Sequence, residues 1–108
     1  MEIEIGGRKR PVKYNINALI EFEELTGSEI IGNIDPNQFA RLKNMRALAF
    51  CGLKYGAIDQ KKEIDFTIED VGSWIGFGDG SMEKFFTAFN NDNAPGKTGE
   101  EKEDDGKK

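Results

Sequence analysis

The chain contains no histidine, so it lacks the side chain that most often serves as a general base or a metal ligand. Acid–base catalysis would have to rest on paired carboxylates instead. The densest acidic group comprises Glu21, Glu23 and Glu24, which we expect to form the solvated face of a short helix. We therefore expect a protein that is not an enzyme and has no catalytic, metal-binding or cofactor-binding residues.

Cysteine and long apolar runs are also scarce. Cys51 is the only cysteine, which excludes an intramolecular disulfide and a cysteine-based metal framework. It lies in the apolar run A-L-A-F-C-G-L, where we expect a buried thiol that packs as a small hydrophobe. No run approaches the roughly 20 apolar residues of a membrane-spanning helix, and residues 1–5 lack the pattern of a signal peptide. These absences predict a soluble intracellular protein that does not bind membranes.

Positive charge forms only one short cluster along the chain. The 108 residues carry 15 basic and 20 acidic side chains, for a net charge of -5. Nucleic-acid binding requires a clustered basic face, and this balance argues against it. The single basic cluster, formed by Arg8, Lys9 and Arg10, has acidic neighbours, and we expect it to lie in a solvated turn.

The C-terminal residues 92–108 have no apolar side chain larger than Ala94 and Pro95. Such a segment cannot bury enough surface to offset the entropy lost on ordering, so we expect a disordered, polar tail. The remaining residues 1–91 are expected to form one domain, with an N-terminal β-hairpin packed on about four helices. This is an α+β class that is mostly α.

Residues 15–27 predict the first helix. Asn15 and Asn17 are both suitable caps, and Asn15 is favoured because Tyr14 could then pack on Leu19. Gly27 lies where a left-handed C-terminal residue is wanted. We expect one apolar stripe on this helix to face the core: Ile16, Leu19, Phe22 and Leu25.

Two registers are open for the N-terminal hairpin. A two-residue Gly6-Gly7 turn would set Ile3 opposite Arg10. A four-residue loop, residues 6–9, would instead pair Ile3 with Val12 and place opposite charges together. Because apolar cross-strand pairs stabilise a sheet, the sequence favours the longer loop.

Three further helices are expected. Asp35 followed by a proline predicts the start of a long helix that Gly56 should stop, with Gly52 allowing close packing inside it. Its second half is apolar nearly all round, which predicts burial on several sides. Thr67 begins a capping box that starts the third helix, and Ser81 is expected to cap the last one. Residues 28–34 remain ambiguous.

The glycines at 76, 78 and 80 resemble a phosphate-binding loop only superficially. No strand is expected before them, the spacing is not G-x-G-x-x-G, and no Lys-Ser/Thr pair follows. Residues 79–83 lack the repeated ligands of a calcium loop. We expect a turn between two helices.

The chain is rich in large aromatic side chains for its size. Eight phenylalanines and one tryptophan are many for so small a domain, and most must be core. Some could remain exposed as a docking patch. The candidate partner-binding residues are Phe77, Met82 and Phe86, because Phe77 lies in a glycine-flanked turn and the others lie on the last helix.

In this order, F-E-E-L-T-G at residues 22–27 and A-L-A-F-C-G-L-K at residues 47–54 resemble the tail assembly chaperones of long-tailed bacteriophages. The resemblance covers residues 1 to about 90. It implies a non-catalytic protein that binds and solubilises the phage tape-measure protein in the host cytoplasm and is absent from the mature virion. A longer form would recruit tail tube subunits through a C-terminal extension. The alternatives are a ring-forming virion protein of the neck or tail and a generic helical adaptor.

Overall fold

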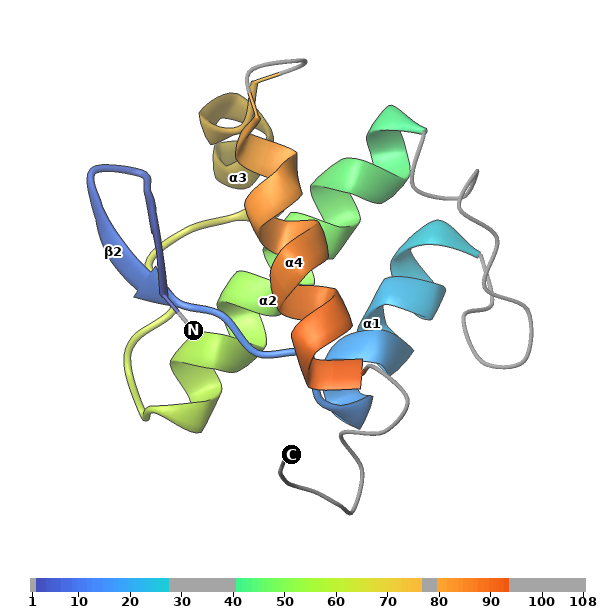
Figure 1. Ribbon diagram of the computed structural model, residues 1–108, viewed down its shortest axis with the longest axis horizontal. Coiled ribbons are helices and arrows are strands. Elements are labelled where there is room, and N and C mark those ends of the chain that lie inside the picture. The colour runs from blue at the N-terminus through green and yellow to red at the C-terminus, as the bar shows by residue number, and fades with distance from the viewer. Residues whose placement is uncertain (1, 28–40, 77–79, 94–108) are drawn as a thin grey trace.

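The computed structural model describes residues 2–27, 41–76 and 80–93 (Figure 1). The chain begins with two antiparallel strands and continues with helices. The described elements are β1 (Glu2–Ile5), β2 (Arg8–Pro11), α1 (Ile16–Thr26), α2 (Leu42–Asp59), α3 (Ile68–Trp74) and α4 (Ser81–Asn93). The predicted fold class, mostly helical with an N-terminal hairpin, is confirmed.

Helix α2 is the centre of the molecule, with β2, α1, α3 and α4 packed around it (Figure 1). Its second half is apolar, and burial there is nearly complete for Leu48, Cys51 and Leu53, as the sequence predicts. Burial raises the pKa of the Cys51 thiol to about 12, with a smaller contribution from the charge of Glu21. Cys51 therefore stays protonated and serves as core.

The predicted end of α2 at Gly56 is wrong, because the helix continues to Asp59. Gly56 is buried against the hairpin, and a Cβ placed there would collide with the Pro11 carbonyl. The glycine allows the helix and the backbone of β2 to approach each other and does not end the helix. The predicted start signal at Asp35 falls outside the described residues.

The predicted hairpin register is also wrong. Gly6 and Gly7 form a two-residue turn with φ of 61° and 88°, and Ile3 pairs with Arg10. Arg10 was expected in a solvated turn, but it is 7% exposed. Its Nε donates to the Ile5 carbonyl at 3.0 Å, and its guanidinium lies 4.6 Å from the centre of a Trp74 ring. A well-bonded arginine can therefore oppose an isoleucine at a buried position.

Both ends of α1 form as predicted. The Asn15 side chain accepts a hydrogen bond from the Ala18 amide at 2.9 Å, and Gly27 ends the helix with φ of 75°. The predicted apolar stripe is only half buried. Leu19 and Phe22 face the core with Ala18, whereas Ile16 and Leu25 are exposed.

Glu21 is not the solvated carboxylate that the sequence predicted. Lys54 on α2 donates to both of its oxygens, at 2.8 and 2.9 Å, and the Tyr55 hydroxyl donates to it at 2.8 Å. The hydrogen bond to Glu21 is the main cause that raises the pKa of Tyr55 to about 12. Glu21 thus connects α1 to the central helix.

The capping box of α3 is confirmed. The Asp70 amide donates to the Thr67 hydroxyl at 3.1 Å, and the Asp70 carboxylate accepts from the Thr67 amide at 2.9 Å. Ser81 is the first residue of α4, and its hydroxyl accepts a hydrogen bond from the Gly76 amide. Ser81 therefore also joins α4 to the end of α3.

Helix α4 buries Phe85, Ala88 and Phe89 against the core. It extends to Asn93, so Asp92, predicted to begin the tail, lies in its last turn. The Asp92 carboxylate accepts a hydrogen bond from the Tyr14 amide at 2.8 Å, which connects the end of the domain to its beginning. Residues 94–108 lie outside the described part.

Candidate functional site

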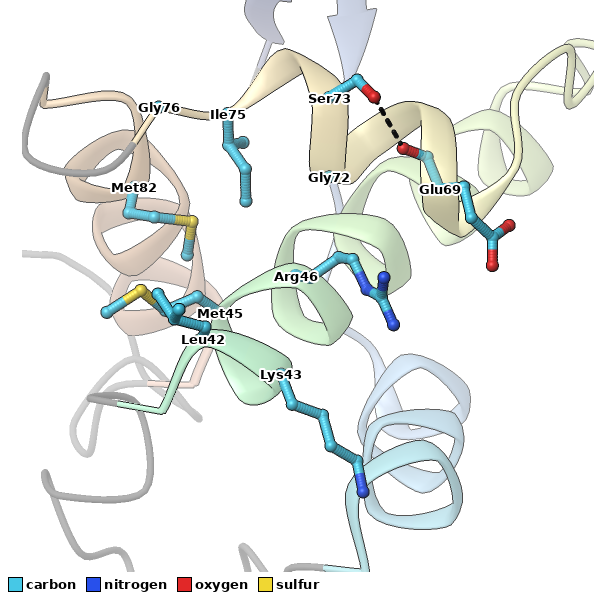
Figure 2. Close-up of a pocket in the computed structure, with 10 residues that line it drawn as sticks. All are labelled: Leu42, Lys43, Met45, Arg46, Glu69, Gly72, Ser73, Ile75, Gly76 and Met82. Carbon is cyan, nitrogen blue, oxygen red and sulfur yellow. Dashed lines mark hydrogen bonds between the residues drawn. The ribbon is translucent and has the colours of Figure 1, made fainter.

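A groove of about 700 Å³ lies between the first half of α2, α3 with its following residues, and the start of α4 (Figure 2). Apolar side chains from three segments form one part of its lining. Charged and hydroxyl side chains and two glycines complete it. The lining residues are Leu42, Lys43, Met45, Arg46, Glu69, Gly72, Ser73, Ile75, Gly76 and Met82.

The apolar part of the groove converges from α2, α4 and the residue after α3. Figure 2 shows Met82 and Ile75 pointing toward the space above α2, with the Met45 side chain extending along α2 below Met82. Met82 is 9% exposed, Met45 and Ile75 are half-buried, and Leu42 is 65% exposed. Methionine is unbranched and polarizable, so it adapts to differently shaped apolar partners. This surface is suited to receiving apolar side chains.

The polar part of the groove contains Arg46 on α2 and Glu69 on α3. The Arg46 stem lies against Gly72, where an added Cβ would come within 2.8 Å of the Arg46 Cδ. The Arg46 Nε is buried and has no hydrogen-bond partner among the described residues. Lys43 and Glu69 are exposed, and the dashed bond in Figure 2 runs from the Ser73 hydroxyl to the backbone carbonyl of Glu69. Two cations and one carboxylate therefore line a groove in a chain of net charge -5.

The three predicted partner-binding residues have different positions. Met82 lines the groove, although most of its side chain is core. Phe86 is half-buried against the core and does not line the groove. Phe77 lies outside the described residues. The structure therefore brings one of the three to this site.

Sequence reasoning missed Leu42, Met45 and Arg46. They lie in the amphipathic first half of α2, which predicts a helix with an apolar face but not what covers that face. The available signal was the spacing of Leu42 and Met45 by three residues, followed by a basic residue. Only the crossing of α3 and α4 turns this face into a groove.

A second pocket of about 400 Å³ lies between the hairpin and the end of α2. Its lining includes Arg8, Arg10, Lys62 and Glu63. Both arginines pair with Asp65, Arg10 at 2.8 Å. These cations hold the hairpin against the loop before α3, so the pocket is explained by the fold.

No arrangement typical of a metal site or a membrane span is found in the described ranges. Residues 2–27, 41–76 and 80–93 contain no group of three or more histidine, cysteine, aspartate or glutamate side chains that could hold a metal ion. None of the helices in these ranges has the length and apolarity needed to cross a bilayer. The groove is therefore the candidate site.

Comparison with models of known families, with curated protein sequences and with solved structures finds no match to this chain.

Proposed function

We propose that this chain is a non-catalytic tail assembly chaperone of a long-tailed bacteriophage, which binds the tape-measure protein and keeps it soluble. The observation that carries the proposal is the open apolar groove formed by Leu42, Met45, Ile75 and Met82. A groove of this kind can accept the apolar face of a partner helix. The resemblance at residues 22–27 and 47–54 supports the choice of partner.

The size of the groove fits reversible binding. Each fully buried apolar anchor contributes about 1.5–3 kcal/mol, and association itself costs at least about 4 kcal/mol. Three or four anchors therefore leave at most about 8 kcal/mol, so the dissociation constant is of about micromolar order at its tightest. An assembly chaperone needs such an affinity, because it must release its client.

The proposal extends to where the protein acts. It binds the tape-measure protein in the cytoplasm of the bacterial host and does not remain in the mature virion. Tail tube subunits are recruited by a longer form of the chain, for which residues 94–108, after the end of α4, serve as the tether.

Co-expression with the tape-measure protein tests the proposal. Leu42→Ser is compared with Ile58→Ser, because both residues are exposed on α2 but only Leu42 lines the groove. We expect the wild type and Ile58→Ser to keep the tape-measure protein soluble, and Leu42→Ser to lower its soluble fraction. An equal effect of both substitutions, or no solubilisation by the wild type, would contradict the proposal.

Mass spectrometry of purified phage particles separates a chaperone from a ring-forming virion protein. A chaperone should be absent or present only in traces, while the tape-measure and tail tube proteins are abundant. Recovery of this chain in stoichiometric amounts would overturn the chaperone function.

A further inference from the structure

Arg46 lines the groove, but it makes no hydrogen bond or ion pair within the described part of the chain that would explain its position. Its aliphatic stem crosses Gly72 closely, and this contact holds the base of the guanidinium between α2 and α3. No hydrogen bond or ion pair joins Arg46 to any residue that the structure describes, and its Nε is buried. A buried N–H without a partner is unfavourable.

The contrast with Arg10 makes this clear. Arg10 is also buried, but its guanidinium donates to two backbone carbonyls and to Asp65 and lies over two aromatic rings. The position of Arg10 is therefore explained by its contacts within the domain. The other, Arg46, lines the groove, and its buried Nε has no hydrogen-bond partner among the described residues.

We propose that the groove selects a partner helix that carries a carboxylate beside its apolar anchors, and that Arg46 receives this carboxylate. The guanidinium is a planar donor that matches a carboxylate, and a charge-assisted bond in a partly buried site is stronger than a neutral one. Lys43 adds a second positive charge on the same side, while Glu69 disfavours an additional acidic residue near α3. The inference rests on the proposed function only for naming the source of the helix.

The chain's own acidic segment is a poorer occupant. Residues 100–105, E-E-K-E-D-D, have carboxylates but no apolar side chain to contact Met45, Ile75 and Met82. An amphipathic helix supplies both kinds of contact. The groove chemistry therefore favours a separate polypeptide.

A display library of helical peptides of about 18 residues tests this inference. Four apolar positions at i, i+3, i+4 and i+7 vary among Leu, Ile, Met and Phe, and one flanking position varies among Glu, Asp, Gln and Lys. Selection on the full wild-type chain should enrich Glu or Asp at the flanking position. Selection on Arg46→Glu should enrich Lys there.

Two further variants control the selection. Lys84→Glu changes an exposed cation on α4 outside the groove and should keep the acidic preference. Arg46→Met keeps an apolar stem against Gly72 and removes the unpaired Nε, so it should fold as the wild type does in a thermal unfolding experiment. Selected peptides should bind Arg46→Met about tenfold or more weakly by fluorescence anisotropy.

The inference is overturned if no peptide is enriched, if the wild type shows no acidic preference, or if Arg46→Glu keeps it. The proposed function is judged separately. Enrichment of acidic peptides with a tape-measure protein that still precipitates on co-expression contradicts the chaperone function alone. A solubilised tape-measure protein without acidic enrichment contradicts the role of Arg46 alone.

Discussion

At the scale of single residues, Arg10 holds together parts of the chain that are far apart in sequence. Its guanidinium bonds the turn of the hairpin through the Ile5 and Gly6 carbonyls and reaches Asp65 in the loop before α3. It also lies over the rings of Phe66 and Trp74. Loss of this side chain would leave the buried Ile5 carbonyl without its donor.

The Asp65 partner gives this cluster a pH dependence. The hydrogen bond from Arg10, followed by that from Arg8, lowers the pKa of Asp65 below its ordinary value of 3.8. A carboxyl with a lowered folded-state pKa contributes stability above its unfolded-state pKa and loses it as the pH falls through the folded-state value.

We therefore expect the wild type to exceed Asp65→Asn in unfolding free energy at pH 5 to 7, and the difference to shrink below about pH 4. Urea denaturation at a series of pH values measures this. Asp59→Asn, an exposed position on α2, serves as the control. A difference that stays constant down to pH 2 would contradict the assigned ion pair.

Glu21 makes a second prediction at this scale, through Tyr55. Because the hydrogen bond to Glu21 is the main cause of the raised pKa, Glu21→Gln should lower the pKa of Tyr55 from about 12 toward 10. Phenolate absorbance followed through an alkaline titration measures it, and the chain has only one other tyrosine. Glu83→Gln, exposed on α4, should leave the curve unchanged. An unchanged curve in Glu21→Gln would argue against this bond.

At the scale of elements, the features that sequence predicted well are local. The cap of α1 at Asn15 and the capping box at Thr67 involve residues three positions apart, so their geometry follows from a short stretch of chain. The hairpin register and the end of α2 were mispredicted because both depend on distant partners. Asp65 and Trp74 satisfy Arg10, and the backbone of β2 explains Gly56.

The groove residues show the same contrast between features that are local in sequence and features that depend on distant partners. Met82 was singled out as a candidate on the last helix, and it does line the groove. Leu42 and Arg46 could not be assigned to a site, because the groove exists only where α3 and α4 cross α2. An exposed leucine and a basic residue on a helix are otherwise ordinary.

Two glycine substitutions test the approach of the hairpin to α2. Gly56→Ala should destabilise by several kcal/mol, since the new methyl group would meet the backbone of Pro11 and, at 2.7 Å, of Val12. Gly72→Ala should cost less than about 1 kcal/mol, because it meets only the flexible Arg46 stem and gains helix propensity. Thermal or urea unfolding of both variants measures the contrast. Equal effects would contradict the close contact of Gly56 and β2.

At the scale of the whole molecule, the core that stabilises the fold and the groove that forms the candidate site are made by largely different sets of residues. The core lies where α2 meets α1, α4 and the hairpin, and includes Phe85, which has no exposed surface. The groove opens beside this core, and Leu42 on its edge is mostly exposed. Binding can therefore be altered without unfolding the domain.

This separation predicts opposite outcomes for two substitutions. Phe85→Ala should lower the unfolding free energy by about 3–5 kcal/mol, because it leaves a cavity in the core. Leu42→Ser should change it by no more than about 0.5 kcal/mol, since the leucine is 65% exposed. Denaturant unfolding of the two variants checks this. A large loss of stability in Leu42→Ser would place that residue in the core.

The hydrogen bond between Tyr14 and Asp92 has a consequence for how the chain is made. Its two ends are 78 residues apart, so the N-terminal segment leaves the ribosome long before its partner in α4. At about 5–20 residues per second, synthesis separates the two by roughly 4 to 16 seconds. During that interval the connection between β2 and α1 can bond to α2 through Lys13 and Tyr14, but it lacks the bond to α4. The contact that joins the start of the domain to its last helix therefore forms only after α4 has been synthesised.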